Sequence, residues 1–182
     1  SFCGDPQTGQ MCLENYLLTY PEEKGYFCVS TSYKIEPNTV EGMHDKNFPM
    51  FEFELKGGMD ELRKVEMELL DYLGFNMAEY ENIRLDLNYQ RGNYDDICKK
   101  YVVEELEPKH EEQIEKNFGR VFFLENFPER TIPFWNMKLN EDEVHSNKID
   151  VIIHGIETIG SAERSTNKEE MREKFKTILN GE

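Results

Sequence analysis

Cysteine is scarce in this sequence, and the cysteines that are present show no pairing pattern. Cys3, Cys12, Cys28 and Cys98 contain no C-x-x-C spacing. The chain therefore offers no disulfide framework, and reduced thiols in a cytoplasmic protein are the simpler interpretation. Long apolar runs are missing too, so no segment is predicted to span a bilayer, and no signal peptide is recognisable. We therefore predict no contact with a membrane.

Basic residues are few compared with acidic ones. The chain has 21 Lys and Arg residues against 37 Asp and Glu residues, which gives a net charge of −16. Such a surface repels phosphate backbones on average, so the chain alone should bind nucleic acids poorly unless a local basic patch or another domain attracts them. The alternative is an acidic surface that carries no information about partners. The 182 residues suffice for a core, and we predict a single domain over residues 1–182.

Two stretches of alternating residues, 26–36 and 48–55, predict two strands joined by a long loop. Each stretch has one largely apolar face and one more polar face. We expect the apolar faces to pack on a core and the polar faces to remain outside it. The apolar faces consist of Phe27, Val29, Thr31, Tyr33 and Ile35 on the first strand and of Phe51, Phe53 and Leu55 on the second.

The polar side of this hairpin has the residue types that hold a nucleotide. Lys34 would meet a phosphate as a point charge, and Phe48 offers a flat ring on which a base can stack. The loop over 37–47 is too long for a tight turn and contains His44, and long loops in compact domains are often functional. The alternative is an ordinary half-buried hairpin with a solvated polar face, which this stretch alone favours.

The same stretch resembles motif 2 of class II aminoacyl-tRNA synthetases, in the subgroup for asparagine, aspartate and lysine. That motif has an Arg and a Glu two residues apart, then a variable loop, then a His or Arg with a Phe four residues later. Lys34 and Glu36 match the first pair, with Lys in place of Arg, and His44 and Phe48 match the second. The resemblance implies that Lys34 grips the α-phosphate of ATP and that Glu36 bonds near the adenine. It further implies that His44 meets the outer phosphates and that Phe48 stacks the adenine.

Residues 10–20 predict a helix that Pro21 ends. Its beginning, Thr8-Gly9-Gln10-Met11-Cys12-Leu13-Glu14, resembles the S-G-Q-L-Y-L-E segment of asparaginyl-tRNA synthetases. By that resemblance Gln10 reaches the amino-acid substrate, where its amide can both donate and accept hydrogen bonds. The alternative is a polar helix N-terminus without a ligand.

The rest of the chain predicts four helices, over 59–73, 94–106, 107–117 and 167–179, and two strands, over 120–125 and 148–154. We interpret the first helix as structural, with an apolar side made of Leu62, Val65, Leu69, Tyr72 and Leu73 and a cap at Gly74. Residues 120–128 and 133–138 resemble the F-L-T-D-Y-P and P-F-Y-M segments of asparaginyl and archaeal aspartyl enzymes. Asn126 stands where the family has an Asp that meets a substrate ammonium. Nearby, Phe127, Phe134 and Trp135 are equally well interpreted as core aromatics.

Two carboxylates accompany the strand over 148–154, because Asp150 lies within it and Glu157 follows it. Oxygen ligands in this arrangement suit Mg²⁺, which usually takes one or two carboxylates. The family has a pattern like D-x-x-x-x-G-x-E-x-x-[S/G]-G-[S/A]-Q-R, which Glu157, Gly160, Ala162 and Arg164 fit. The resemblance implies that Asp150 and Glu157 hold Mg²⁺ and that Arg164 holds the substrate's side-chain carboxylate or amide.

The resemblance as a whole implies an α+β fold, an antiparallel β-sheet flanked by helices as in class II aminoacyl-tRNA synthetase catalytic domains. The domain would be partial, because motifs 1 and 3 have no counterpart in residues 1–182. The implied activity is activation of an amino acid, asparagine or aspartate, with ATP and Mg²⁺, and Lys34 and Arg164 would be catalytic. The family is homodimeric, and tRNA would bind through regions outside this chain. Two alternatives stay open, namely a paralogue that activates an amino acid without charging tRNA, like asparagine synthetase, and a non-catalytic relative that binds a nucleotide or a protein.

Overall fold

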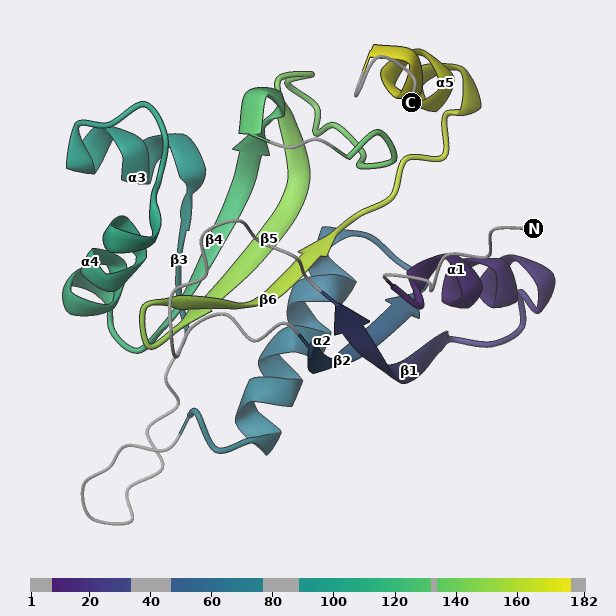
Figure 1. The fold of residues 1–182 in the computed structure, drawn as a ribbon, viewed down its shortest axis with the longest axis horizontal. Coiled ribbons are helices and arrows are strands. Elements are labelled where there is room, and N and C mark those ends of the chain that lie inside the picture. Colours follow the sequence, from purple (N-terminus) through teal and green to yellow (C-terminus); the bar gives the residue numbers. More distant parts are fainter. Residues whose placement is uncertain (1–7, 34–46, 77–88, 132–133, 178–182) are drawn as a thin grey trace. The chain divides into compact units, whose positions relative to one another are not determined.

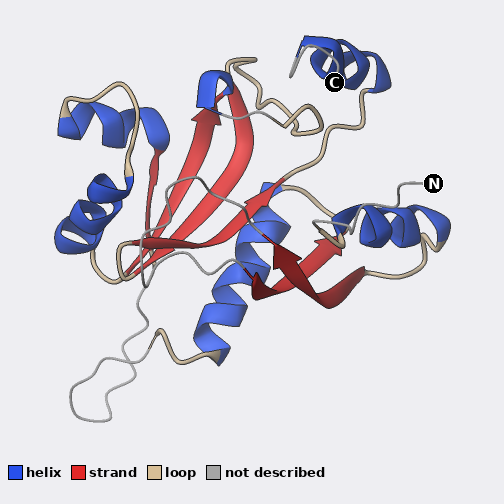
Figure 2. Ribbon diagram, viewed as in Figure 1, coloured by secondary structure: helices blue, strands red, loops and turns tan. Residues whose placement is uncertain are grey.

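The structure, a computed structural model, describes residues 8–33, 47–76, 89–131 and 134–177. The chain divides into two compact units, Ser1–Gly57 and Gly58–Glu182, and each is described by itself. Figures 1 and 2 show their helices and strands. Among the described helices, none has the length and apolar character that crossing a bilayer requires.

The first unit consists of a helix and a two-stranded hairpin. Helix α1 (Gln10–Thr19) packs against β1 (Gly25–Tyr33) and β2 (Asn47–Leu55), and buries Leu13. The strands are antiparallel, with a register that runs from the pair Gly25↔Leu55 to the pair Tyr33↔Asn47. The predicted helix and both predicted strands are thus confirmed, although residues 34–36 of the first strand lie outside the described residues.

The faces of this hairpin are the reverse of the prediction. Phe27, Val29 and Phe51 on the apolar face are 71%, 70% and 54% exposed, whereas Glu52 on the opposite face is only 3% exposed. The rings of Phe27 and Phe51 pack on each other at a centroid distance of 5.7 Å. The reason is that the segment entering α1 lies on the polar face, where it donates hydrogen bonds to Glu52. Alternation identified the two faces, but it could not tell which one another element would cover.

The second unit contains a four-stranded sheet in the order β3-β4-β5-β6. Strand β5 (His145–Ile153) runs antiparallel to both of its neighbours, β4 (Val121–Pro128) and β6 (Ile156–Ala162), and the short β3 (Gln90–Asn93) runs parallel to β4. The predicted α+β class with a largely antiparallel sheet is confirmed. The helices are α2 (Met59–Tyr72), α3 (Tyr94–Tyr101), α4 (Pro108–Phe118) and α5 (Lys168–Thr177), with a 3-10 turn at Glu129–Thr131.

Helices cover both faces of this sheet. The core against α3 and α4 includes Phe122 and Leu124 of β4 together with Ile152 of β5. Helix α2 instead sends Arg63 to Glu125, the residue after Leu124 on the same strand. Because successive side chains of a strand point to opposite faces, α2 lies on the face opposite α3 and α4.

The buried side of α2 differs from the prediction. Leu62, Glu66 and Leu70 are buried, whereas Val65, Tyr72 and Leu73 are exposed. The stripe therefore has the i, i+4, i+8 spacing of one helix face, but its centre is a carboxylate that a hydrophobic pattern assigns to solvent. Glu66 is inside because it accepts a hydrogen bond from Ser161 of β6.

Strand β6 was not predicted, although its connection to β5 carries a signal. His154 and Gly155 have φ values of 51° and 72°, so two consecutive residues are in the left-handed region that tight hairpin turns need. A side chain at Gly155 would also lie 2.9 Å from the Cα of Glu112, so the turn requires glycine. Strand β3 was likewise not predicted, because its four residues are polar.

Candidate functional site

Gln10 is the first residue of α1 and is held by the segment before it. Its backbone N–H donates to Thr8 Oγ1 over 3.2 Å. The carboxylate of Glu52 accepts from the Thr8 hydroxyl, from the backbone N–H of Gly9 at 2.8 Å and from the hydroxyl of Ser30 at 2.7 Å. Burial by itself would raise the pKa of Glu52, but these hydrogen bonds outweigh it and lower that pKa. The ionised Glu52 thus fixes the entry into α1 and the position of Gln10.

Close packing also constrains this entry. A methyl group on Gly9 would lie 2.6 Å from the Sγ of Cys28 and 3.0 Å from an oxygen of Glu52. Phe48, half-buried, is on the same face of the hairpin as Glu52, since the two positions are an even number apart. Lys34, Glu36 and His44 lie outside the described residues.

The carboxylates of Asp150 and Glu157 meet beside Gly160 on β5 and β6. Asp150 pairs directly with Gly160, and a methyl group there would lie 3.6 Å from Asp150 Oδ1 and 3.0 Å from Glu157 Oε1. Asp150 is 5% exposed, and its Oδ1 has no hydrogen-bond partner among the described residues. The missing side chain of Gly160 therefore leaves room for two oxygens that face a common space.

The charges around this pair decide its protonation. Burial raises the pKa of Asp150 to about 7, the ammonium of Lys148 opposes that shift, and the negative charge of Glu157 adds to it. Lys148 also contacts Asp150 Oδ2 directly. From α4, Glu111 accepts a hydrogen bond of 3.0 Å from the backbone of Glu157, and burial raises the pKa of Glu111 as well.

Asp150 and Glu157 suit a magnesium ion as ligands, but two carboxylates do not complete its coordination shell. The unpartnered Asp150 Oδ1 and the facing Glu157 oxygen supply the two carboxylates that Mg²⁺ commonly takes in proteins. Within the described residues, no group of three or more His, Cys, Asp or Glu side chains is arranged to hold a metal. Any such ion would therefore need other ligands, such as water or phosphate oxygens, to complete its shell.

Arg164 follows β6, and the segment over 134–139 contacts both its side chain and its backbone. Its guanidinium donates to Asn136 Oδ1 at 3.1 Å, and Arg164 forms an isolated β-bridge with Met137. Of the three aromatics considered above, Phe127 is in the core, Phe134 is 56% exposed and Trp135 is partly buried. The core interpretation thus holds for Phe127 but not for Phe134.

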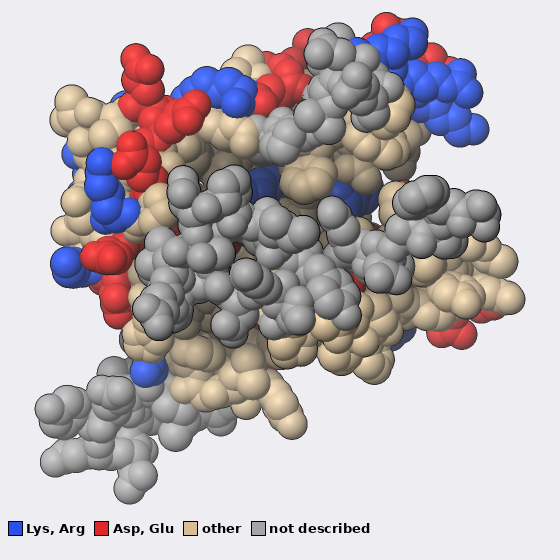
Figure 3. All heavy atoms as spheres, viewed as in Figure 1, with Lys and Arg blue, Asp and Glu red and all other residues tan. Residues whose placement is uncertain are grey.

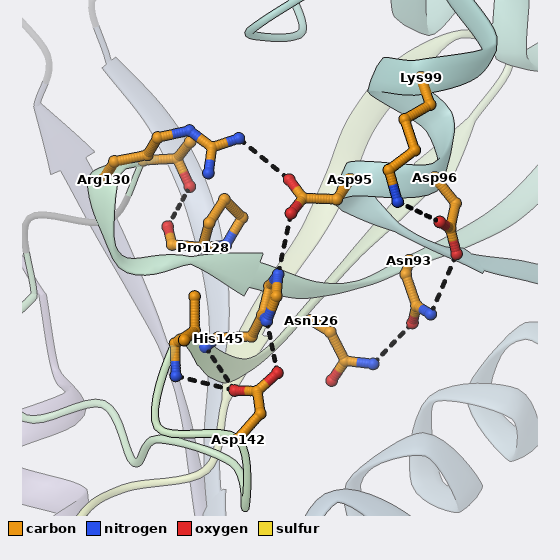
Figure 4. Close-up of polar contacts among 11 residues, drawn as sticks. Asn93, Asp95, Asp96, Lys99, Asn126, Pro128, Arg130, Asp142 and His145 are labelled. Carbon is orange, nitrogen blue, oxygen red and sulfur yellow. Dashed lines mark hydrogen bonds and ion pairs between the residues drawn. The ribbon is translucent and has the colours of Figure 1, made fainter.

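Asn126 sits at a β-bulge and belongs to a polar cluster at the ends of β3, β4 and β5 (Figure 4). Its φ of 57° is left-handed, and its amide donates to Asn93 at 2.7 Å. In the same cluster His145 lies between Asp142, at 2.6 Å from Nδ1, and Asp95, at 3.1 Å from Nε2. Burial alone would lower the pKa of His145, but both carboxylates raise it, which favours an imidazolium between them.

Two buried polar pairs, which the sequence patterns did not predict, connect α2 with the sheet. Arg63 binds both oxygens of Glu125, at 2.8 and 3.0 Å, and the two side chains are 16% and 8% exposed. Next to it a cavity of about 560 Å³ opens between α2 and the 138–141 segment. Glu66 is fully buried, and its Oε1 accepts from Ser161 at 2.5 Å while its Oε2 has no partner among the described residues. The spacing of Arg63 and Glu66, three residues apart on one helix face, was the available signal.

Glu66→Gln should remove a dependence of stability on pH. Burial raises the pKa of Glu66 to about 7, above its ordinary value of 4.5. Between these two pH values the folded state therefore keeps a proton on Glu66 that the unfolded state has released. Wild-type stability should therefore fall as pH rises from about 4.5 to 7, by up to roughly 3 kcal/mol from this group. Urea denaturation at pH 5 and pH 8 measures the unfolding free energies of Glu66→Gln and of wild type. The difference between them, variant minus wild type, should be larger at pH 8.

Glu68→Gln provides the control for this prediction, because Glu68 is on the same helix and is 66% exposed. Its unfolding free energy should differ from that of wild type by the same small amount at both pH values. Equal differences at pH 5 and pH 8 for Glu66→Gln would show that Glu66 titrates normally.

Residues 14–182 match the family of tRNA synthetases class II (D, K and N). No curated protein sequence matches the chain. Similar solved structures include asparaginyl-tRNA synthetase from Pyrococcus horikoshii complexed with asparaginyl-adenylate, with a TM-score of 0.77 and 19% identity over 93% of this chain and 44% of that one.

Two further structures come from Entamoeba histolytica. Its aspartyl-tRNA synthetase has a TM-score of 0.72 and 16% identity over 96% of this chain and 42% of that one. Its asparaginyl-tRNA synthetase in complex with asparaginyl-adenylate has a TM-score of 0.68 and 18% identity over 94% and 44%. The chain thus spans less than half the length of these proteins, and the likeness to them establishes the fold. Because the family match covers nearly all of its residues, the chain belongs to the class II tRNA synthetases of the D, K and N group.

Proposed function

We propose that this chain is part of a catalytic core that activates asparagine or aspartate with ATP and Mg²⁺, forming an aminoacyl-adenylate and releasing pyrophosphate. The observation that carries the proposal is the pair of carboxylates at Asp150 and Glu157, which meet over Gly160 and leave one buried oxygen without a partner. Support comes from the family and from the fold shared with an asparaginyl-tRNA synthetase complexed with asparaginyl-adenylate.

The reaction needs no protein nucleophile, because the amino-acid carboxylate attacks the α-phosphate directly. The protein would contribute position and charge. Lys34 would bind the α-phosphate, with His44 near the outer phosphates, and Phe48 would stack on the adenine with Glu36 beside it. Asp150 and Glu157 would hold Mg²⁺, which supplies charge neutralisation at the phosphates when bound.

The amino acid would be selected by two side chains. Gln10 at the start of α1 would bond to the substrate's polar groups, and Arg164 would bind its side-chain carboxylate or amide, which favours aspartate or asparagine. Because Asn126 is neutral and stands where the family has an Asp, other groups would bind the substrate ammonium. The test is exchange of label between pyrophosphate and ATP in the presence of each amino acid. Exchange with neither asparagine nor aspartate, nor with any other amino acid, would end both enzymatic interpretations.

A second candidate is a paralogue that activates the amino acid without charging tRNA. The observation in its favour is the net charge of −16, which opposes binding of a polyanion. Transfer of labelled amino acid to tRNA separates the two, since only a tRNA ligase gives a labelled acid-insoluble product. Dimerisation, expected from the family, is read from the mass in solution.

Glu52→Gln should weaken amino-acid binding through Gln10. The amide nitrogen of the variant cannot accept a hydrogen bond, so either Thr8, which donates to Oε1, or both Gly9 and Ser30, which donate to Oε2, lose their acceptor and the start of α1 loosens. We expect the KM for the amino acid in the exchange assay to rise about tenfold while the KM for ATP stays within about twofold. Glu23→Gln, which changes an exposed carboxylate of the same unit, is the control. Parallel increases in both KM values would show that Glu52 acts on stability alone.

A further inference from the structure

A second cavity lies between α5 and the segment before Met137. Its volume is about 480 Å³, and its lining combines aromatic, apolar and cationic side chains without any carboxylate: Trp135, Lys168, Met171, Arg172, Phe175 and Lys176. The rings of Trp135 and Phe175 meet edge to face, with centroids 5.7 Å apart and planes at 85°. The three glutamates of α5, Glu169, Glu170 and Glu173, lie outside this lining.

Helical spacing gathers the cations into one line. Lys168, Arg172 and Lys176 are at positions i, i+4 and i+8 of α5, so they share a stripe and follow one another at intervals of about 6 Å along the axis. Figure 3 shows Lys and Arg atoms gathered over α5. Lys176 pairs with Glu173, whereas Lys168 and Arg172 make no ion pair with any described residue. The ammonium of Lys168 and the guanidinium of Arg172 are thus available to an anion.

The aromatic groups beside this stripe are only partly covered. Phe175 is 47% exposed and Trp135 is partly buried. Exposed rings flanked by cations are the combination that binds single-stranded nucleic acids, because bases stack on the rings and phosphates meet the cations. An acidic peptide would use the cations but would leave the stacking faces without a matching group.

We propose that the α5 surface, defined by Trp135, Lys168, Met171, Arg172, Phe175 and Lys176, is a docking site for single-stranded RNA. The choice of RNA as the partner rests on the proposed function, while the site itself rests on the charge and exposure of these residues. It supplies the local basic patch that a chain of net charge −16 needs in order to approach a phosphate backbone.

Trp135 makes the proposal directly measurable, because it is the only tryptophan of the chain. A single-stranded 12-residue RNA of mixed sequence, added to the full chain at 50 mM salt, should quench its fluorescence in a saturable way, with a Kd of about 10⁻⁵ M. Lys168→Glu/Arg172→Glu should raise that Kd at least tenfold and lower the slope of log K against log salt by about 1.4, since two phosphate contacts are lost. Phe175→Ala should raise the Kd about fivefold or more, and Phe175→Tyr should not.

Lys64→Glu/Lys99→Glu is the matched control, because it changes the net charge equally at exposed positions on α2 and α3. It should leave the Kd within about twofold. Equal weakening by both double variants, equal quenching by poly-glutamate or by duplex RNA, or no binding at all would each overturn the proposal. Binding is measured without ATP or amino acid, so RNA binding without exchange would refute the proposed function alone, and exchange without RNA binding would refute this site alone.

Discussion

Asp150→Asn and Glu157→Gln are each expected to slow amino-acid-dependent ATP–pyrophosphate exchange by about 100-fold or more. An amide cannot replace a carboxylate as a hard anionic ligand, and both oxygens face the space beside Gly160. A second readout is binding of Mn²⁺, as a paramagnetic substitute for Mg²⁺, in the presence of a non-hydrolysable adenylate analogue. Each variant should weaken that binding without changing the fold seen by circular dichroism.

Asp96→Asn is the control for this pair, because Asp96 is a surface carboxylate, 62% exposed and paired with Lys99. It should leave exchange and Mn²⁺ binding unchanged. Gly160→Ala offers an independent test, since its methyl group would stand 3.0 Å from Glu157 Oε1 and should weaken Mn²⁺ binding although both carboxylates remain. Full exchange by Asp150→Asn would remove the carboxylate pair from the proposed mechanism.

Arg63→Ala is expected to lower the free energy of unfolding by about 3–5 kcal/mol. The substitution leaves Glu125, whose side chain is 8% exposed, as a buried charge with neither of its two hydrogen bonds from the guanidinium. Urea denaturation at pH 7 measures the loss. The result would identify α2 as an element that stabilises the sheet. Because β4 pairs with β5, this effect would extend to the strand that carries Asp150.

Two variants separate this effect from a general weakening of α2. Lys64→Ala, at the neighbouring position, removes an exposed side chain whose distance to Glu68 is 3.9 Å and should cost no more than about 0.5 kcal/mol. Arg63→Met/Glu125→Leu removes both charges and should recover most of the stability, because buried pairs are often replaceable by apolar residues. A loss of less than about 1 kcal/mol in Arg63→Ala would mean that Glu125 finds water or another donor.

Local patterns predicted most of the secondary structure but not which face of each element is buried. Alternation located β1 and β2, and the 3.6-residue period located α1, α2 and α5. The errors have one cause in common. Glu52 and Glu66 are both buried carboxylates, and each is held inside by donors from distant parts of its own unit, Thr8 and Gly9 in one case and Ser161 in the other. A hydrophobic pattern places such residues in solvent because it does not see their partners.

The candidate site was predicted from motifs, and the structure bears on only part of it. Asp150 and Glu157, seven residues apart, come together because the tight turn at His154 and Gly155 folds β6 back on β5. The meeting of the two carboxylates is therefore a property of the hairpin, whereas the α5 surface arises from Trp135 and Phe175, which are far apart in the chain. The roles of all the candidate site residues stay predictions: Gln10, Lys34, Glu36, His44, Phe48, Asp150, Glu157 and Arg164.

By itself the sequence determined the family, the order of most elements and the residue types at the site, because these depend on local periodicity and on motifs written along the chain. Only the tertiary structure decided which hairpin face is covered, which carboxylates are buried and which of them face each other. The physical reason is that burial and pKa depend on the donors, charges and backbone that other segments bring within a few ångströms, and a linear pattern holds no record of those neighbours.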